Sequence, residues 1–207
     1  MTEKNGPRQQ RARETRLRLI DVAEQLFVEH GYTPVSVERI VRAAEVTKGA
    51  FYHHFPDKLA VFRAAFERVD REMAERVMLG ALQGNSPLEM VGKGMRACFE
   101  LCTTPRYGRL VYIEAPNALG WEEWHRIDTS IAAELVHAGL EAAVEMGELS
   151  AEAHSIEALT TLLLGSILQA AITIAQADDR QATCLKLADE MDQLLRALSS
   201  ASTSTTV

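Results

Sequence analysis

Apolar residues recur every three or four positions along most of this chain, which is the spacing of one face of an α-helix. Glycine, proline and serine interrupt the pattern at several places and so mark the ends of helices. Neither the alternation typical of strands nor a hairpin signal occurs in the 207 residues. We therefore predict an all-α fold of about nine helices, with helical ranges near 11–30, 36–45, 47–55, 57–79, 86–103, 106–119, 121–146, 151–177 and 178–198.

The stretch from Ser36 to Lys58 predicts two short helices, a tight turn between them and the start of a third helix. Ser36 is a good N-cap for the first helix, and apolar residues follow it at helical spacing as far as Ala44. Thr47 caps the second helix, and Pro56 ends it before Asp57 caps the next. The arrangement is a helix-turn-helix, which predicts DNA binding.

The second helix of this motif points Phe51 and Phe55 into the core and leaves five residues on its outer face. Small residues near its N-terminus allow a close approach to base edges, while Lys48 and Tyr52 can reach phosphates. The positive end of the helix dipole also favours anions. We predict that this helix enters the major groove with Lys48, Gly49, Ala50, Tyr52 and His53 outward.

Residues 13–58 resemble the tetracycline-repressor (TetR) family of bacterial transcriptional regulators. Phe27 to Tyr32 matches the family pattern F-x-x-x-G-[YF], and Tyr52 to Lys58 matches Y-[HY]-[HY]-F-x-x-K. The resemblance implies DNA contacts by Thr47, Lys48, Ala50, Tyr52, His53 and Lys58, with Tyr52 and Lys58 at phosphates. The full set of candidate DNA-binding residues is Ser36, Thr47, Lys48, Gly49, Ala50, Tyr52, His53 and Lys58.

Two positions depart from the family pattern. Glu45 stands where a glycine is common in the turn, so it is expected to strain the turn and to place an anion near DNA. Ala50 lacks the hydroxyl that many relatives carry. The base sequence of the operator therefore does not follow from the resemblance.

The net charge of −7 is unexpected for a DNA-binding protein, but the charge is unevenly distributed along the chain. Residues 1–55 hold nine Lys and Arg against seven Asp and Glu (+2), which leaves thirteen against twenty-two (−9) for the remainder. Six of the nine cations lie in the first 20 residues. We predict that residues 1–10 form a flexible basic arm that follows phosphates or enters the minor groove, with a solubilising tail as the alternative.

The segment from Ala158 to Ala175 contains no charged residue, which touches the lower limit for a membrane span. We reject a span because polar residues interrupt the segment and no aromatic or basic belt flanks it. A helix that is apolar on all sides needs a partner, most simply the same helix of a second subunit. The last helix offers a matching stripe of Leu185, Ala188, Met191, Leu195 and Leu198, and the resemblance implies a homodimer through the last two long helices.

The domains that we predict are the basic arm (1–10), a DNA-binding domain (11–56), an effector-binding and dimerisation domain (57–198) and a disordered tail (199–207). Aromatic and polar residues outside the DNA-binding domain favour a small-molecule site for a hydrophobic effector, because such sites are mostly apolar with a few polar groups. Solid core is the alternative. The candidate ligand-binding residues are Phe62, Phe66, Phe99, Tyr112, Asn117, Trp121, Trp124, His125 and Gln169.

The competing hypothesis is a helical enzyme or metal-binding protein that uses two E-x-x-H pairs, Glu122 with His125 and Glu134 with His137. These pairs are twelve residues apart on one predicted helix, about 18 Å, so they cannot share a metal. We therefore predict no enzymatic activity, no metal and no cofactor, and we interpret Cys98, Cys102 and Cys184 as core residues. The first 20 residues lack an apolar signal segment, which predicts a cytoplasmic protein. Repression is the favoured sign of regulation, with activation as the alternative.

Overall fold

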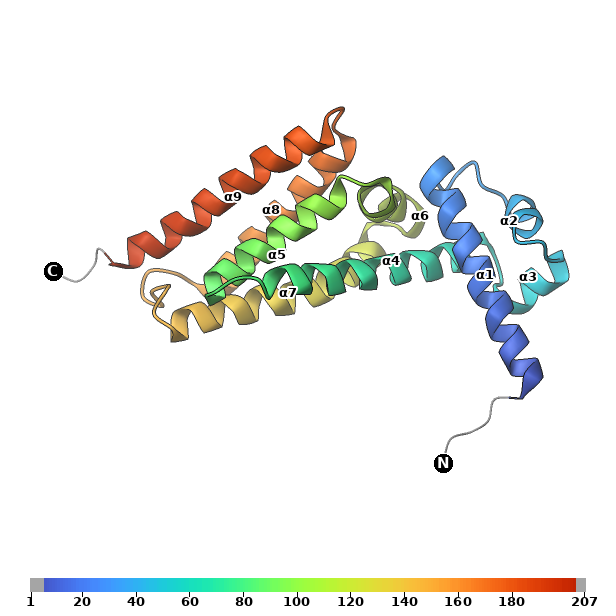
Figure 1. The fold of residues 1–207 in the computed structure, drawn as a ribbon, viewed down its shortest axis with the longest axis horizontal. Helices are drawn as coiled ribbons and strands as arrows, with labels where there is room; N and C mark the ends of the chain where they lie inside the picture. The colour runs from blue at the N-terminus through green and yellow to red at the C-terminus, as the bar shows by residue number, and fades with distance from the viewer. Residues whose placement is uncertain (1–5, 204–207) are drawn as a thin grey trace.

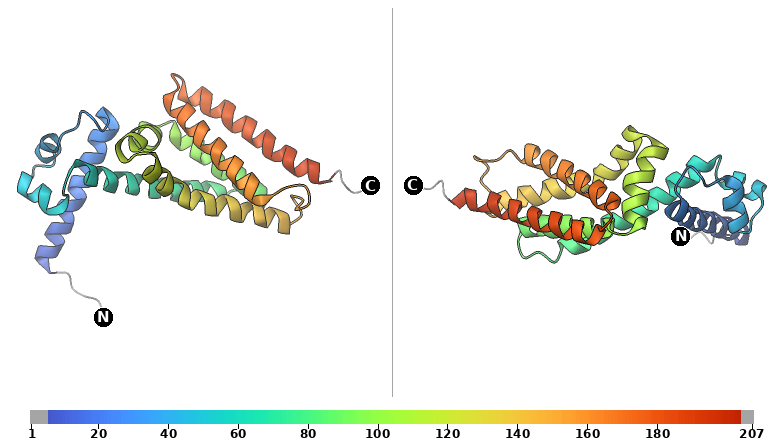
Figure 2. Two further views of the ribbon diagram at one scale, coloured as in Figure 1. Left: turned by 180° about the vertical axis from the view of Figure 1, so that it is seen from behind. Right: turned by 90° about the horizontal axis from the view of Figure 1, so that it is seen from above.

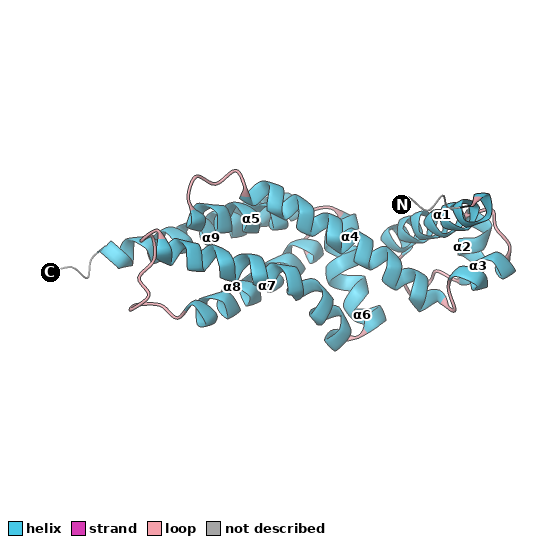
Figure 3. Cartoon of the chain, turned by 90° about the horizontal axis from the view of Figure 1, so that it is seen from below, coloured by secondary structure: helices cyan, strands magenta, loops and turns pink. Residues whose placement is uncertain are grey.

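The computed structural model describes residues 6–203 and confirms an all-α fold: helices fill this range, and no strand occurs within it (Figures 1 and 3). Nine α-helices and one π-helix follow one another in these described residues. Their bounds are α1 Pro7–His30, α2 Val37–Ala43, α3 Lys48–His54, α4 Lys58–Ala81, α5 Pro87–Cys102, η1 Pro105–Glu114, α6 Ala115–Leu119, α7 Trp121–Glu145, α8 Ile156–Gln176 and α9 Arg180–Thr203.

The molecule is elongated, with two parts joined by one long helix (Figures 1 and 2). The head consists of α1, α2 and α3 at one end. The body consists of α5 to α9 with η1. The connecting helix α4 begins beside α3 and extends along the body. A movement of α4 therefore displaces groups in both the head and the body.

Local capping signals place the helices of the head and the start of the body. The side chains of Ser36, Thr47, Asp57 and Ser86 each accept a hydrogen bond from the backbone N–H three residues later, as predicted. Such caps stabilise a helix by about 1 kcal/mol each. Glu89 in the first turn of α5 adds to this cap, because its carboxylate accepts a hydrogen bond from the backbone N–H of Asn85.

Aromatic side chains fill the centre of the head. Phe27 packs edge-on against Phe62, with ring centroids 5.0 Å apart, and both contact Tyr32. Phe51 packs against Phe55 on the inner face of α3. Phe27, Phe51 and Phe62 have no exposed surface. The predicted inward orientation of Phe51 and Phe55 is therefore confirmed.

Two terminal segments are more helical than we predicted. Helix α1 begins at Pro7, so residues 7–10 are helical and do not belong to a flexible arm; a proline is well tolerated in the first helical turn because it needs no N–H there. Helix α9 continues to Thr203, so residues 199–203 are not a disordered tail. The remainder of the predicted arm (1–5) and of the predicted tail (204–207) lies outside the described residues.

The start of α8 also differs from the prediction. The helix begins at Ile156 and not at residue 151, and its N-cap is Ser155, whose hydroxyl accepts from the backbone N–H of Ala158. Ser150 instead accepts from Ala153 in a separate turn. Ser155 is therefore the residue that caps α8.

The segment after α5 forms a π-helix, η1, where we predicted one α-helix over residues 106–119. Pro116 instead lies in the first turn of the short helix α6, where it costs no hydrogen bond. Gly108 allows η1 to cross α5 closely, since a Cβ atom at this position would lie 2.2 Å from the carbonyl oxygen of Cys102. π-Helical turns are rare and occur often at functional sites.

Candidate DNA-binding surface and ligand cavity

The outer face of α3 is accessible, as the sequence predicts. Lys48, Gly49, Tyr52 and His53 are exposed, and Ala50 is half-buried. Tyr52 keeps 53% of its surface exposed although it packs against Phe51. An exposed tyrosine beside a lysine and a histidine on one short helix forms a surface that can donate hydrogen bonds to phosphates and base edges.

Ser36 and Thr47 hold the two helices of the motif through their caps. The Ser36 hydroxyl accepts from the N–H of Arg39 at 3.2 Å, and that of Thr47 accepts from Ala50 at 3.1 Å. Both residues lie at helix N-termini, where backbone N–H groups and the dipole favour anions. Their contact with DNA remains a prediction.

Lys48 pairs with Glu38 across the two helices, with 2.5 Å between Nζ and Oε1. The hydrogen bond to Lys48 lowers the pKa of Glu38 to about 2, and the same contact raises the pKa of Lys48. Both groups are exposed, so solvent screens the pair and it is easily exchanged for another partner. Lys48 can therefore leave Glu38 for a phosphate or a base.

Lys58 is held inside the protein more firmly than we predicted. Its ammonium group donates to the carbonyl of Tyr32 at 2.9 Å and lies 4.0 Å from the centre of the Tyr32 ring. Desolvation lowers its pKa. Lys58 thus fixes the turn after α1, and its predicted phosphate contact is not tested by this geometry.

The turn between α2 and α3 contains the expected strain. Glu45 has φ 55°, and it is the single non-glycine residue with positive φ in the described part of the chain. The left-handed conformation costs an L-residue about 1–2 kcal/mol. Glu45 is exposed and lies three residues before the first residue of α3.

The body encloses a cavity of about 480 Å³ between α4, α5, η1, α7 and α8. This volume falls within the range of about 300–1,000 Å³ that is usual for small-molecule sites. Methionine, leucine, valine and alanine side chains form most of the wall. Leu82 of α4 and Ile131 of α7 line it while remaining partly exposed, so the mouth lies near these two helices.

Of the nine predicted ligand-binding residues, Tyr112 lines this cavity. Four others are solid core with no exposed surface: Phe62, Phe66, Phe99 and Trp124. The aromatic residues that we expected to form the wall therefore fill the spaces between helices. The actual wall consists of smaller and more flexible side chains.

The remaining four predicted residues lie away from the cavity wall. Trp121 is 58% exposed and packs against His125, with ring centroids 5.4 Å apart. Asn117 is exposed and donates to the carbonyl of Ile113, and Gln169 is exposed and donates to Thr173. These residues lie on α6 and on faces of α7 and α8 other than those that line the cavity.

Two carboxylic acids, Asp70 of α4 and Asp128 of α7, line the cavity, and our sequence analysis missed both. Desolvation raises the pKa of Asp128 to about 8, with a further contribution from the charge of Asp70. Desolvation likewise raises the pKa of Asp70 to about 6. Tyr112 lies beside Asp128 and partly offsets this rise in its pKa.

A signal for these acids exists in the sequence. Asp70 follows Phe66 by four residues and precedes Met73 by three, so it occupies the apolar face of its helix. Asp128 likewise follows Trp124 by four residues and precedes Ile131 by three, so it also occupies an apolar helix face. A single carboxylate on an apolar face is unusual, since burying a charge is costly.

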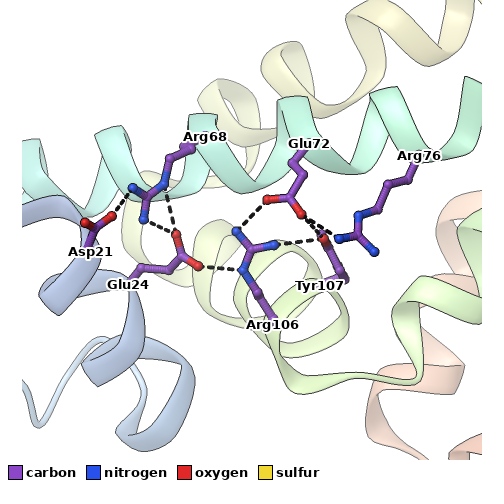
Figure 4. Close-up of polar contacts among 7 residues, drawn as sticks. All are labelled: Asp21, Glu24, Arg68, Glu72, Arg76, Arg106 and Tyr107. Atoms are coloured by element: carbon purple, nitrogen blue, oxygen red, sulfur yellow. Dashed lines mark hydrogen bonds and ion pairs between the residues drawn. The ribbon is translucent and has the colours of Figure 1, made fainter. Parts of the chain in front are cut away.

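A network of ion pairs joins the head to the body (Figure 4). Its centre is Glu24 of α1, which is buried and accepts from Arg68 of α4 and, at 2.6 Å, from Arg106 of η1. Arg106 also pairs with Glu72 of α4 at 2.8 Å and lowers the pKa of Glu72 to about 2. The outer members of the network are Asp21, Arg76 and Tyr107.

The far end of η1 contacts the backbone of the head. Glu114 accepts from the N–H of Tyr32 at 2.8 Å and pairs with Arg109 at 3.1 Å. Arg109 donates to the carbonyl of Glu29 at the end of α1. Gly31, with φ 84°, leaves room for these groups, because a Cβ atom there would lie 2.7 Å from Glu114. One face of η1 thus holds the head while Tyr112 reaches the cavity.

The E-x-x-H pairs both lie on α7, as predicted, and form no shared site. His137 contacts Thr160 at 3.3 Å and Glu141 at 3.4 Å. Among the described residues, no three His, Cys, Asp or Glu side chains gather in a group that could hold a metal ion. The three cysteines are free and buried.

Helix α8 has an exposed, uncharged face. By length and composition it is the one described helix that could cross a membrane, and a third of its most apolar stretch is buried in the chain. Leu162 is 68% exposed, and a Cβ atom on Gly165 would meet nothing within 4 Å. The stripe predicted on α9 is largely turned inward: Ala188, Met191 and Leu195 are buried within the chain, and Leu185 is exposed.

Comparison with family models identifies both parts of the chain. Residues 88–198 match the model described as the tetracyclin repressor-like C-terminal domain. Residues 19–65 match the model of bacterial regulatory proteins of the tetR family. The first match alone covers more than half of the chain.

Individual proteins give the same result. The transcriptional repressor BepR of Brucella suis is 35% identical over 103 residues, a match that spans 49% of each chain. The Tn10 TetC protein of Escherichia coli is 28% identical over 82% of this chain and 85% of its own length. A solved TetR-family regulator from Pectobacterium atrosepticum aligns with a TM-score of 0.77 and 29% identity, and covers 91% of this chain and 95% of its own.

Proposed function

Because this chain belongs to the TetR family of bacterial transcriptional regulators, which are DNA-binding proteins and not enzymes, we propose that it is a ligand-responsive repressor. It binds a near-palindromic double-stranded operator as a homodimer in the cytoplasm, and a small hydrophobic effector releases it. The observation that carries the proposal is the exposed face of α3 on a head that is tied through η1 to a body with a cavity.

The DNA-binding step uses two copies of α3. A dimer places them in successive major grooves on half-sites about 34–36 Å apart. Lys48 and Ala50 lie where they can influence base preference, and Tyr52 and Lys58 are assigned to phosphates. For this assignment, the ammonium group of Lys58 contacts a phosphate either while it still packs against Tyr32 or after it has moved away from Tyr32.

The homodimer is supported by the uncharged exposed face of α8. Leu162, Gly165 and Thr173 share this face, and all three are exposed. Small residues such as Gly165 permit a second helix to approach closely. Burial of this face in a partner explains an apolar helix better than exposure to water does.

The coupling between the two sites runs through α4 and η1. Asp70 of α4 and Tyr112 of η1 line the cavity, and residues of the same two elements, Arg68 and Arg106, hold Glu24 in the head. A ligand that separates Tyr112 from Asp128 shifts η1 and so changes the position of the heads. A differential affinity of about 1–3 kcal/mol between the two forms changes operator affinity about 5- to 150-fold, which is enough for a switch.

Repression is supported by a relative: BepR is named as a transcriptional repressor. Ligand binding has a structural parallel in the transcriptional regulator FadR of Bacillus subtilis, which shares the fold and was solved with stearoyl-CoA. That structure is only 18% identical, so it supports the presence of an effector and not its chemistry.

The DNA-binding proposal is tested by selecting duplexes from genomic fragments and measuring affinity at physiological salt. We expect a near-palindromic site. Tyr52→Phe should weaken binding to all duplexes, while Lys48→Ala should alter the preference among bases. Equal affinity for the selected site and a scrambled duplex would show that the protein is not an operator-specific regulator.

The dimer is tested with Leu162→Arg and a matched control, Leu79→Arg, which changes an equally exposed leucine on α4. The first substitution should give a folded monomer with at least about a 100-fold loss of operator affinity, since one head makes half of the contacts. The control should remain dimeric. Sedimentation velocity gives the oligomeric state, and a dimeric Leu162→Arg variant would contradict the interface.

A further inference from the structure

The cavity of the body combines an apolar wall with an unbalanced set of charges. Two of its lining residues in the described part of the chain are carboxylic acids, Asp70 and Asp128, and no lysine, arginine or histidine lines it. An apolar wall alone suits any hydrophobic compound. The two acids narrow the range of possible ligands, because carboxylates favour a positively charged ligand.

The surroundings of the acids are defined on every side. Cys98 of α5 and Tyr112 of η1 face the cavity with them, and α8 contributes only the apolar Leu164, Ile167 and Leu168. Tyr112 lines the cavity beside Asp128 and contacts the Cys98 thiol at 3.9 Å. On α4, Arg71 favours the charged form of Asp70, whereas Glu67 disfavours it.

Among the described residues, neither Asp70 nor Asp128 forms a hydrogen-bonded pair with a cation, whereas the buried Glu24 accepts from two arginines. A desolvated carboxylate without such a partner is costly, so it stays protonated or takes a positive ligand. Burial raises the pKa of Asp128 to about 8, in keeping with a protonated acid in the empty cavity. Asp128 can thus exchange its proton for a cationic ligand.

We propose that the effector is a lipophilic cation, an amine or quaternary ammonium compound whose charged group lies against Asp128 and Asp70 and whose hydrocarbon part lies along the methionine and leucine wall. This inference rests on the proposed function, since it assigns a chemical class to the cavity described there. The bound cation then separates Asp128 from Tyr112. Because Tyr112 belongs to η1, this step connects recognition of the positive charge to η1.

The proposal predicts a pH dependence of a definite sign. A cation requires ionised Asp128, so its affinity should rise about tenfold for each pH unit from 6 towards 8, as the protein gives up its proton more easily. A neutral ligand of the same length should bind independently of pH. Calorimetry in buffers of different ionisation enthalpy should show release of about one proton per cation bound at pH 7.

The experiment compares three probes with equal chains below their micelle-forming concentrations: decyltrimethylammonium, decanol and decanoate. Binding to the full-length protein is measured by calorimetry and by the fluorescence of Trp121 and Trp124. We expect decyltrimethylammonium to bind at least tenfold more tightly than the other two. Asp128→Asn should remove this preference, Asp70→Asn should reduce it, and circular dichroism should show unchanged helicity in both.

Glu134→Gln is the matched control, because Glu134 is an exposed acid on the same helix as Asp128. It should leave the preference intact. Equal binding of all three probes, tighter binding of decanoate, absence of binding by the cation, or a preference that persists in Asp128→Asn would each overturn the inference. The operator selection and the Leu162→Arg test use no ligand, so the proposed function stands or fails separately.

Discussion

The head and the body of this regulator use their apolar residues in opposite ways. In the head, aromatic side chains meet where α1 packs on the start of α4, and Phe27 and Tyr32 touch each other and Phe62 of α4. In the body, smaller and more flexible side chains surround a space of about 480 Å³. A filled unit holds its surface in one shape, which reading DNA requires. A hollow unit can change shape when the space is occupied, which sensing requires.

The largest effect that separates the two parts should come from truncating their apolar residues. Phe27→Ala should cost about 3–5 kcal/mol, because it opens a new void in a filled core. Leu168→Ala should cost only about 1 kcal/mol, because Leu168 already borders empty space and is half-buried. Urea unfolding at one protein concentration gives both values. Equal costs would mean that the body is as tightly filled as the head.

A second change should separate the two parts mechanically. Glu114→Ala leaves the Tyr32 N–H and Arg109 without their acceptor, at a cost of about 1–3 kcal/mol. Both tryptophans lie on α7, so fluorescence reports on the body alone, whereas circular dichroism reports on all helices. The two unfolding curves should coincide in the wild type and diverge in the variant. Coincident curves in Glu114→Ala would show that η1 does not connect head and body.

The acid in the cavity provides a third, smaller contrast. The folded-state pKa of Asp128 is raised to about 8, above its ordinary value, so the folded protein holds this proton more tightly than the unfolded chain. The contribution of Asp128 to stability is therefore present at low pH and declines as the pH rises towards 8. Asp128→Asn should gain about 1–2 kcal/mol over the wild type between about pH 6.5 and pH 8. A difference independent of pH would show that Asp128 is not desolvated.

The smallest effect should come from the turn of the head. Glu45→Gly removes the left-handed strain of about 1–2 kcal/mol but adds the flexibility of glycine, so it should stabilise the protein by about 0.5–1 kcal/mol. Glu45→Ala is the control, because it removes the same charge and keeps the strain. If both variants are equally stable, the charge and not the backbone conformation is responsible.

The sequence predicts the head far better than the cavity, and the reason is physical. The head depends on local signals: Ser36, Thr47 and Asp57 cap helices within three residues, and Phe51 and Phe55 define a face within one helix. Helical periodicity shows which face turns inward. It does not show whether the inward space is filled, so Phe66 and Phe99 were mistaken for a wall when they are core.

Other differences arise where distant contacts decide between local alternatives. Ser150 and Ser155 both cap a turn, with Ala153 and Ala158 as donors, and α8 begins only after Ser155. The π-helix η1 has no simple periodic signal, and it forms where Gly108 crosses α5 and where Arg106 and Glu114 reach the head. Asp70 and Asp128 could have been found from the sequence as carboxylates on apolar faces.

The way η1 holds the head has a consequence for protein engineering. Arg109 and Glu114 bind main-chain groups, the carbonyl of Glu29 and the N–H of Tyr32, which every residue type presents in the same way. Only Glu24 contributes a head side chain to this attachment at Arg106. A chimaera that carries another head, grafted before α4 with a glutamate kept at this position, should therefore respond to the same inducer at a different promoter, which makes the body an interchangeable sensor module.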